Sequence, residues 1–317
     1  MRFSVIIPLY NKAPYAAKAI ESVLSQTYAD YELVIMDDGS TDDSSSVASK
    51  AIEGRDNCHL HHQQNAGVSM ARNNAVALSH GKYICFLDAD DWWAPAFLEE
   101  MSKMIDEYPE AGIYGTNYTI VNETRHKTRV ASVGVEPGFK CGYIDYCRVY
   151  ANGMYMPLWT GTVCIPRSVF EEMGGFPKGI KLGEDFLLWI KIVLKNKVAF
   201  LNKPLAYYNQ DIEEANRGVT SKGYDPDSFM TFHFNQFEEQ EKNNHDLKVL
   251  LDRIRVYSLL RFRFNNEKME RVKKEIAKVD FSNVDKRYKL YYGLPYPLIW
   301  SYNKVRSIAS FIKHRLR

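Results

Sequence analysis

The chain has 317 residues, 45% of them hydrophobic, so it is long enough to bury one large core or two smaller ones. Its formal charge of +2 excludes a strongly basic nucleic-acid-binding protein, and we expect no nucleic-acid partner. The charge is unevenly distributed, because eight Lys and Arg residues and no acidic residue follow Asp285. The residues up to Asp285 include 33 basic and 39 acidic ones, so an acidic body carries a basic end.

The five cysteines form no CxxC motif and no zinc-type spacing with histidine. An odd number of cysteines without a signal peptide indicates reduced thiols in a cytoplasmic protein. Pro8 interrupts the apolar run at residues 3–7, which is too short for the core of a signal peptide. No stretch approaches the ~20 apolar residues that span a bilayer.

The first ninety residues alternate between strand and helix patterns. We expect strands at 3–7, 32–36, 58–62 and 82–87, and helices at 15–26, 43–52 and 67–78. Connections this short indicate right-handed βαβ units, and therefore an α/β fold with a mostly parallel central sheet flanked by helices. Ligands bind such sheets at the carboxyl ends of the strands, where polar residues follow each predicted strand here.

The strand at 82–87 is followed by three carboxylates, Asp88, Asp90 and Asp91. Acidic groups this close repel one another unless a cation lies among them. Carboxylate oxygens suit Mg²⁺ or Mn²⁺, and these ions commonly carry phosphates. The sequence therefore predicts a metal–diphosphate site on a loop that faces solvent. The alternative is an acidic turn before a helix, with Asp91 as the cap and Pro95 in the first turn.

Five blocks of sequence occur in one order between residues 3 and 210. They are SVIIPLYNK (4–12), VIMDDGSTD (34–42), QNAGVSMARN (64–73), LDADD (87–91) and GEDFLLW (183–189). In this order and spacing the blocks resemble the family 2 inverting glycosyltransferases, of the bacterial surface-polysaccharide type. The resemblance implies a GT-A fold, a nucleotide-diphosphate sugar as donor, and Mn²⁺ or Mg²⁺ as cofactor.

The resemblance also implies roles for single residues in binding the donor. The donor-binding residues would be Pro8, Tyr10, Asn11, Asp38, Asn65, Arg72 and Asp88. Tyr10 would stack on the nucleobase. Asp38 can accept a hydrogen bond from a pyrimidine N–H, which favours uracil over cytosine and thus a UDP-sugar. Asp90, together with Asp88, would hold the metal ion that stabilises the departing diphosphate.

Simpler roles remain open for several of these positions. Tyr10 could be a surface tyrosine, and Arg72 could form a surface salt bridge. We expect Thr41 and Asp42 only to cap a helix.

Inverting transfer also needs a base close to the acceptor hydroxyl, and we expect Asp185 in this role, with Glu184 as the less favoured candidate. Alternatively, both acids only complement the dipole of the helix that follows them, a dipole that would keep Asp185 ionised. Trp159 and Thr160 resemble family segments on the acceptor side.

One departure from the family pattern follows the strand expected at 204–208. Many relatives carry a histidine there that helps to hold the metal or the diphosphate, and this chain has none. Asp211 could replace it as an oxygen ligand, or Arg217 and Lys222 could supply positive charge. The sequence leaves this choice open.

We expect a catalytic domain at residues 1–222 and a helical region at 223–317. Within the first, residues 1–95 would form the donor-binding half and residues 96–222 the acceptor half. Helical patterns occupy 229–242, 246–264 and 268–279. Residues 301–316 combine an apolar stripe with flanking basic residues, which is typical of an amphipathic helix on an anionic membrane surface. The alternative is a terminal helix that packs on the body.

These observations together predict an inverting, metal-dependent hexosyl- or N-acetylhexosaminyltransferase. Its acceptor would be a saccharide or a lipid-linked molecule in surface-polysaccharide or glycolipid synthesis, and it would be peripheral on the inner face of the cell membrane. One alternative is a catalytically inactive protein that binds sugar nucleotides. Another is a nucleotidyltransferase, although residues 8–11 lack the Gly-rich phosphate loop common in that class.

Overall fold

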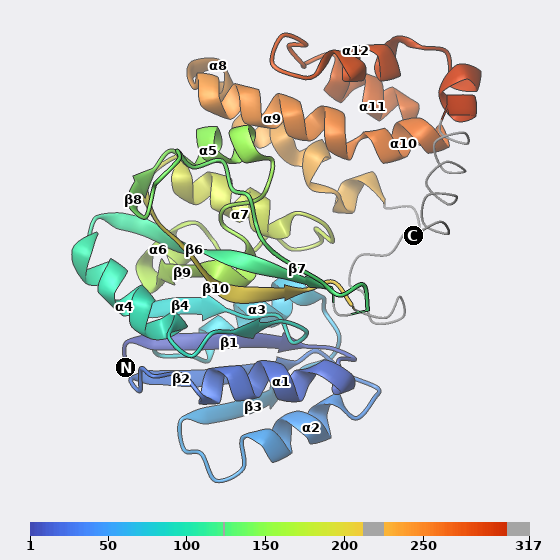
Figure 1. Cartoon of the computed structure of the whole chain (residues 1–317). Helices are drawn as coiled ribbons and strands as arrows, with labels where there is room; N and C mark the ends of the chain where they lie inside the picture. Colours follow the sequence, from blue (N-terminus) through green and yellow to red (C-terminus); the bar gives the residue numbers. More distant parts are fainter. Residues whose placement is uncertain (123, 212–224, 303–317) are drawn as a thin grey trace. The chain divides into compact units, whose positions relative to one another are not determined.

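The computed structural model describes residues 1–122, 124–211 and 225–302 (Figure 1). The chain divides into two compact units, an amino-terminal unit, Met1–Tyr224, and a carboxyl-terminal unit, Asp225–Arg317. Each unit buries apolar side chains of its own.

Four parallel strands and three helices open the amino-terminal unit. They are β1 (Phe3–Leu9), α1 (Ala13–Leu24), β2 (Tyr31–Asp37), α2 (Ser44–Ala51), β3 (Cys58–His62), α3 (Val68–Ala77) and β4 (Tyr83–Phe86). Every element predicted in this region is present, with its ends displaced by two residues at most. β1 and β2 are buried along almost their whole length, and parallel strands covered on both faces read as continuous apolar runs.

The order of these strands in the sheet is β3-β2-β1-β4. The chain moves outward from β1 to β3 and then returns to the other side of β1, where β4 pairs with it. α1 and α2 pack against each other (Figure 1). This reversal beside β1 creates a topological switch point, where sheets of this kind bind their ligands.

The second half of the unit continues the same sheet in mixed orientation. Its elements are β5 (Trp92–Trp93), α4 (Phe97–Glu107), β6 (Ala111–Asn122), β7 (Lys127–Val130), β8 (Cys141–Ile144), α5 (Tyr146–Gly153), η1 (Thr160–Thr162), β9 (Val163–Pro166), α6 (Arg167–Glu172), α7 (Glu184–Val193) and β10 (Lys197–Asn209). β9 runs antiparallel to β4 and β6, whereas β10 runs parallel to β6. β5 and β8 pair antiparallel with β10, and β7 does so with β6. The predicted α/β fold is confirmed. The parallel pairs are β1 with β2, β1 with β4, β2 with β3, and β6 with β10.

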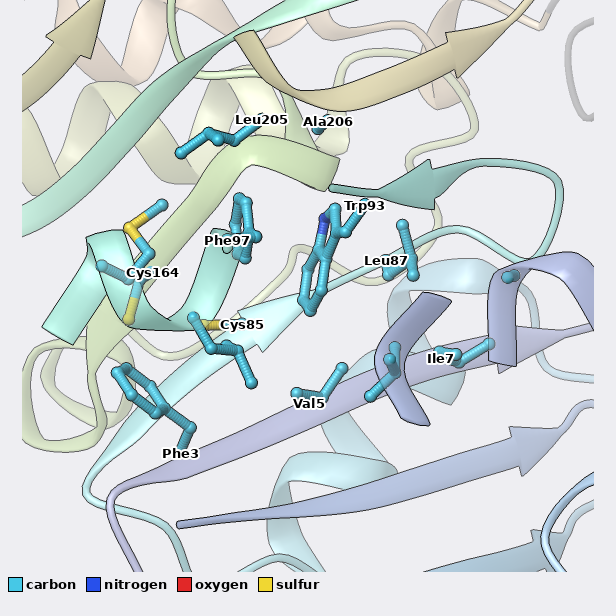
Figure 2. Packing of buried hydrophobic residues seen from close by; sticks show 14 of the residues in the cluster. Phe3, Val5, Ile7, Cys85, Leu87, Trp93, Phe97, Cys164, Leu205 and Ala206 are labelled. Carbon is cyan, nitrogen blue, oxygen red and sulfur yellow. The ribbon is translucent and has the colours of Figure 1, made fainter. Parts of the chain in front are cut away.

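The loop after β4 is anchored to the core by its aromatic residues. Figure 2 shows Trp93 and Phe97 among the buried side chains that β1 and β4 contribute. The two rings stack with their centroids 4.0 Å apart, and the indole N–H of Trp93 donates a hydrogen bond to the carbonyl of Gly161 at 2.7 Å. A buried indole with a satisfied N–H fixes the chain on both sides of it. The acidic loop is thus held at its carboxyl end.

The alternative role for Asp91 as a helix cap is wrong. α4 begins at Phe97, its N-cap is Ala96, and β5 lies between Asp91 and the helix. The Asp91 carboxylate is buried and instead accepts a hydrogen bond from the backbone N–H of Asn209, at 2.8 Å. Asp91 therefore joins the acidic loop to the end of β10.

The carboxyl-terminal unit is helical, as predicted. Its elements are η3 (Pro226–Ser228), η4 (Met230–Phe237), α8 (Glu238–Asn243), α9 (His245–Ser258), α10 (Leu260–Asn265), α11 (Met269–Ile276) and α12 (Lys286–Gly293). The pattern at 229–242 corresponds to a 3₁₀ segment followed by α8, and the pattern at 246–264 to two helices, α9 and α10. The amphipathic helix expected at 301–316 lies, from residue 303 onward, outside the described residues.

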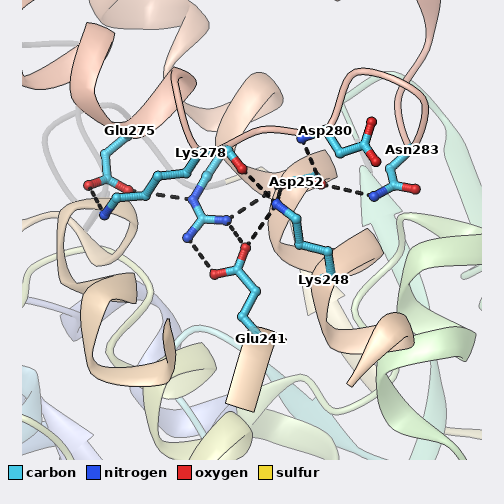
Figure 3. Close-up of polar contacts among 8 residues, drawn as sticks. Glu241, Lys248, Asp252, Glu275, Lys278, Asp280 and Asn283 are labelled. Atoms are coloured by element: carbon cyan, nitrogen blue, oxygen red, sulfur yellow. Dashed lines mark hydrogen bonds and ion pairs between the residues drawn. The ribbon is translucent and has the colours of Figure 1, made fainter. Parts of the chain in front are cut away.

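A network of charged side chains lies inside this unit (Figure 3). Arg255 is buried on α9 and forms two hydrogen bonds with the carboxylate of Glu241, at 2.5 and 2.8 Å.

Within the described ranges, no helix is long and apolar enough to cross a membrane.

Candidate functional site

The carboxyl ends of β1–β4 lie at one edge of the sheet. Leu9 of β1 pairs with Asp37 of β2, and Asp37 pairs with His62 of β3. β4 is parallel to β1, so Asp88 leaves the sheet at the same edge. The polar residues that follow these strands therefore converge beside the switch point, as their positions after predicted strands indicated.

Asn11 fastens the loop after β1 to the loop after β2. Its φ of 48° lies in the left-handed region, which asparagine tolerates better than most residues. The Asn11 side-chain oxygen accepts a hydrogen bond from the backbone N–H of Thr41 at 2.8 Å, and the Asn11 N–H donates to Ser40 Oγ at 3.1 Å. Tyr10 beside it is 45% exposed, so its ring can meet a ligand, while Pro8 is half-buried in β1.

Asp42 ties the starts of two helices together. Its carboxylate accepts hydrogen bonds from the backbone N–H of Ala13 at 3.2 Å and from that of Ser44 at 3.0 Å. These N–H groups belong to the first turns of α1 and α2, where the helix leaves donors unpaired. Asp42 thus pairs donors at the starts of both helices, although the N-cap positions are Lys12 and Asp43. The cap role expected for Thr41 is wrong, because Thr41 bonds to Asn11.

Asp38 is buried and organises the chain after β3. Its carboxylate accepts hydrogen bonds from Gln63 Nε2 at 2.7 Å and from the backbone N–H groups of Ala66 and Gly67 at 2.8 and 2.9 Å. The side-chain amide of Asn65 donates to the Asp38 carbonyl at 3.0 Å. A carboxylate has about four acceptor positions, and three of those of Asp38 are used within the chain.

The acidic loop is less exposed than the sequence suggested. The Asp88 side chain is 28% exposed, Asp90 is nearly buried and Asp91 is fully buried. The ammonium group of Lys12 pairs with Asp90 Oδ2 at 2.5 Å. Burial, followed by the charges of neighbouring carboxylates, raises the pKa of Asp91 well above its ordinary value, and burial and Asp88 also raise the pKa of Asp90 against the effect of Lys12. The loop therefore concentrates negative charge that a cation would stabilise.

Arg72 links the acidic loop to the start of α7. It is 3% exposed, and its guanidinium contacts Asp88 at 2.7 Å and Glu184 at 2.8 Å. The group also lies 4.9 Å from the centre of the Phe176 ring. Burial alone would lower the pKa of Arg72, but Asp88, Glu184 and Asp185 raise it above its ordinary value. Arg72 is therefore a buried, charged link and not a surface salt bridge.

Asp185 lies in the first turn of α7 with both carboxylate oxygens engaged. One oxygen accepts a hydrogen bond from the hydroxyl of Thr160 at 3.0 Å, and the other from the backbone N–H of Phe186 at 2.7 Å. Burial raises the pKa of Asp185, with Arg72 opposing the shift. This direction is contrary to the expectation that the helix dipole keeps the carboxyl ionised. Burial and then Asp185 raise the pKa of neighbouring Glu184 to about 7.

Several residues that lie at this edge were not predicted from the sequence as site residues. Lys12 stands directly after Asn11 in the first block, so its position was a signal, but nothing local indicated its pairing with Asp90. Trp159, expected on the acceptor side, lies half-buried against the rings of Tyr118 and Tyr208, which the sequence did not single out.

The acidic loop offers only part of the ligand set that a divalent ion requires. No group of three or more His, Cys, Asp or Glu side chains within residues 1–122, 124–211 and 225–302 is arranged to hold a metal ion. Magnesium is usually held by one or two carboxylates together with phosphates and water. Asp88 and Asp90 could supply that smaller share, and Lys12 pairs with Asp90 in the same loop region.

The candidates for replacing the family's late histidine can be placed only in part. The Asp211 carboxylate accepts a hydrogen bond from the backbone N–H of Thr124, at 2.9 Å, and the Asp211 N–H donates to the side chain of Asn209. Arg217 and Lys222 lie outside the described residues.

Comparisons with known proteins agree with this arrangement. The model of glycosyl transferase family 2 matches residues 4–157, and that of glycosyl transferase family group 2 matches residues 83–241. An uncharacterized glycosyltransferase of Rickettsia felis is 36% identical over 205 residues, which cover 65% of this chain and 32% of that protein. Glycosyltransferase GlyA of Streptococcus pneumoniae is 32% identical over 219 residues, covering 65% and 30%. The chain thus spans about a third of the length of these curated relatives.

Two solved structures have a similar fold. The first is S. aureus TarS 1-349 in complex with UDP-GlcNAc, with a TM-score of 0.71, 21% identity, and coverage of 92% of this chain and 84% of that one. The second is the mannosyltransferase PcManGT from Pyrobaculum calidifontis in complex with GDP-Man and Mn²⁺, with a TM-score of 0.55, 16% identity, and coverage of 97% and 80%. Identities this low establish the fold alone. The family models show that this chain belongs to the family 2 glycosyltransferases, and the solved structures show that it has the GT-A fold.

Proposed function

We propose that this chain transfers a hexosyl or N-acetylhexosaminyl group, with inversion, from a nucleotide-diphosphate sugar to a hydroxyl of a saccharide or lipid-linked acceptor. The observation that carries the proposal is the contact of Arg72 with both Asp88 and Glu184. This contact unites the acidic loop, expected to face the diphosphate, with the helix that carries the candidate base.

Residues 1–95 form the donor-binding half in this proposal. The exposed ring of Tyr10 stacks on the base, and Asn11 and Asn65 keep the surrounding loops in place. Asp38 accepts, beside its three hydrogen bonds within the chain, one from the N–H of a uracil ring, so UDP is the favoured nucleotide. The similar TarS structure contains UDP-GlcNAc, which supports a UDP-sugar, while PcManGT contains GDP-Man.

Asp88 and Asp90 would hold Mn²⁺ or Mg²⁺ together with the diphosphate of the donor. A bound ion would supply positive charge that stabilises the leaving nucleoside diphosphate. The protein adds Arg72, whose charge lies beside Asp88 in a buried environment. The ammonium group of Lys12 compensates the charge of Asp90 in the chain without a bound ion.

Asp185 is the proposed base, and residues 96–222 form the acceptor half. Thr160 donates to one Asp185 oxygen, which fixes the orientation of the carboxylate. Asp185 then accepts the proton of the acceptor hydroxyl as that oxygen attacks the anomeric carbon from the face opposite the diphosphate. The raised pKa of Asp185 makes it a stronger base than an ordinary aspartate.

The test measures nucleotide release from a panel of UDP-sugars and GDP-mannose, with and without Mn²⁺. We expect release from at least one UDP-sugar, and a kcat about 10²–10⁴-fold lower in Asp185→Asn with unchanged nucleotide binding. Asp30→Asn, a change at an exposed carboxylate, is the matched control. Pyrophosphate release from UTP and a sugar 1-phosphate would indicate a nucleotidyltransferase instead, and binding without any release an inactive sugar-nucleotide-binding protein.

A further inference from the structure

Three aromatic rings from separate segments meet beside the candidate base. We propose that Trp159 and Tyr208, backed by the buried ring of Tyr118 and together with it here called the aromatic platform, bind a sugar ring of the acceptor. This inference rests on the proposed function and assigns a ligand class, a pyranose, to a set of side chains. The centre of the Trp159 ring lies 5.4 Å from the centre of the Tyr118 ring and 5.1 Å from that of the Tyr208 ring.

The register of two strands places both tyrosines on one face of the sheet. β6 and β10 are parallel, with Tyr118 opposite Ala206 and Ile120 opposite Tyr208. Side chains alternate between faces along a strand, so residues two apart share a face. Tyr208 therefore shares the face of Tyr118, whereas Tyr207, one residue away, stacks on Trp92, with ring centroids 5.4 Å apart.

Trp159 is fixed against this face by the chain that follows it. Gly161 has no side chain, and a Cβ atom there would lie 2.7 Å from the Trp159 ring. The Trp159 carbonyl accepts hydrogen bonds from the N–H and the hydroxyl of Thr162, at 2.8 and 2.7 Å. The Gly161 carbonyl is in turn bonded to the buried indole of Trp93. Trp159 is thus held in place by the packing and hydrogen bonds of the segment that follows it.

The exposure of the platform suits a ligand. Tyr118 is buried, Trp159 is half-buried and Tyr208 is 37% exposed, so apolar ring surface continues from the core to solvent. Sugar rings have one face made largely of C–H groups, which packs against an aromatic face while the hydroxyls keep their hydrogen bonds. Aromatic rings combine large apolar area with little loss of side-chain freedom, which favours them at binding sites.

The platform adjoins the groups that would perform the chemistry. Trp159 directly precedes Thr160, whose hydroxyl bonds to Asp185. The buried hydroxyl of Tyr146 has no hydrogen-bond partner in the described part of the chain, and its pKa is raised by burial and, to a smaller extent, by charges that include Asp185 and Tyr118. A sugar on the platform would bring a hydroxyl near Asp185.

The test uses saturation-transfer difference NMR on the whole chain without donor. The probes are the methyl β-glycosides of glucose, galactose and N-acetylglucosamine at millimolar concentration. We expect saturation of the C–H protons of at least one glycoside, and binding about 3- to 10-fold weaker in Tyr208→Ala. Tyr208→Phe keeps the ring and should bind as the unchanged chain does. Tyr143→Ala is the matched control, because Tyr143 is 41% exposed on β8, which pairs with the opposite end of β10.

Three results would overturn the inference. They are no saturation of any of the three glycosides, equal saturation in Tyr208→Ala, and loss of UDP binding in Tyr208→Ala, which would place the ring in the donor site. Failure of the proposed function has a different signature. In that case no sugar nucleotide is turned over, whatever the glycosides do in the absence of donor.

Discussion

Arg72 carries much of the electrostatics at the candidate site, because one buried guanidinium balances Asp88 and Glu184 together. Arg72→Met leaves both carboxylates near a buried, uncharged side chain. Removing one partner of a buried ion pair typically costs about 3–5 kcal/mol, so we expect a clear loss in the free energy of unfolding. Arg72→Lys keeps the charge without the planar fork, and should recover stability better than kcat.

Urea unfolding and steady-state kinetics with the active UDP-sugar would measure the two effects separately. Arg148→Met is the control, since Arg148 forms an exposed pair with Asp145 and should change neither quantity. If Arg72→Lys matches the unchanged chain in both kcat and stability, a point charge suffices and the two-carboxylate link has no catalytic role.

Asp90 is the residue that tests the metal assignment. Asp90→Asn should leave the protein folded, because the amide has the size of the carboxylate and its oxygen can still accept a hydrogen bond from Lys12. Binding of Mn²⁺ in the presence of UDP, followed by the EPR signal of free Mn²⁺, should weaken strongly. kcat/KM should fall by about 10²-fold or more, as expected for loss of a metal ligand. Unchanged Mn²⁺ binding in Asp90→Asn, with exposed Asp43→Asn as the control, would remove Asp90 from the metal site.

Glu184 should make stability depend on pH. Burial and then Asp185 raise its pKa from 4.5 to about 7, against the opposing effect of Arg72. Because the folded-state pKa is the higher one, the contribution of Glu184 to stability is complete below pH 4.5 and is lost as the pH rises through about 7. We expect the free energy of unfolding to fall more between about pH 5 and pH 8 in the unchanged chain than in Glu184→Gln. Urea unfolding across this range measures it, and equal slopes would contradict the assignment.

The residues at strand ends could be predicted, and the contacts between distant segments could not. Asp38 and Asp88 each follow an apolar strand pattern, so their place at one sheet edge followed from the alternation of elements. The Lys12–Asp90 pair joins positions 78 residues apart, and the Arg72–Glu184 pair joins positions 112 apart. No periodicity or spacing encodes such pairs, because they depend on how loops pack once the sheet has formed.

At the scale of elements, the first βαβ units were predictable because their strands are short, apolar and separated by helices. β6 (Ala111–Asn122) was not predicted, although it is buried over almost all its length. Its sequence contains glycine and polar residues that dilute the strand pattern. Gly115 is required there by packing, since a Cβ atom would lie 2.4 Å from the Leu158 side chain. Tertiary contact, not local propensity, thus selects this strand.

The packing of α8, α9 and α11 depends on a buried charge. Arg255 on α9 pairs with Glu241 on α8, and lies within 3.4 Å of Glu275 on α11 (Figure 3). Lys248 supports the same network through Asp252, at 2.6 Å. Arg255→Met should therefore destabilise the carboxyl-terminal unit by about 3–5 kcal/mol, because Glu241 stays buried and keeps only the contact with Lys248 at 3.2 Å. Urea unfolding followed by far-UV circular dichroism measures this loss.

The control for this prediction is Arg287→Met, which breaks an exposed pair with Asp285. We expect no measurable change in the unfolding midpoint for that variant, since exposed ion pairs are screened by solvent. The double variant Arg255→Met, Glu241→Met should recover much of the lost stability, because an apolar pair replaces the buried charge. If Arg255→Met alone is as stable as the unchanged chain, the network does not hold these helices together.

At the scale of the whole chain, basic charge and apolar side chains gather toward the carboxyl end. No residue of α12 is buried among the described residues, and the helix carries Lys286, Arg287 and Lys289. Just beyond it, Leu298 is 55% exposed and Trp300 is 44% exposed. Exposed aromatic and aliphatic side chains beside basic ones are typical of surfaces that bind the headgroup region of a bilayer. We therefore propose that this end of the chain holds the enzyme on an anionic membrane, near a lipid-linked acceptor.

The sequence of residues 303–317 contains five more Lys and Arg residues and no acidic residue. Each cation near an anionic leaflet contributes about 1 kcal/mol, and this contribution weakens with salt. The chain should therefore co-sediment with phosphatidylglycerol vesicles at low salt, bind phosphatidylcholine vesicles much less, and lose most of its binding when residues 303–317 are deleted. Far-UV circular dichroism and urea unfolding of the truncated chain should remain unchanged. If deletion instead lowers stability, or if phosphatidylglycerol vesicles capture no protein at low salt, the segment packs on the body and the enzyme reaches its acceptor without a membrane anchor of this kind.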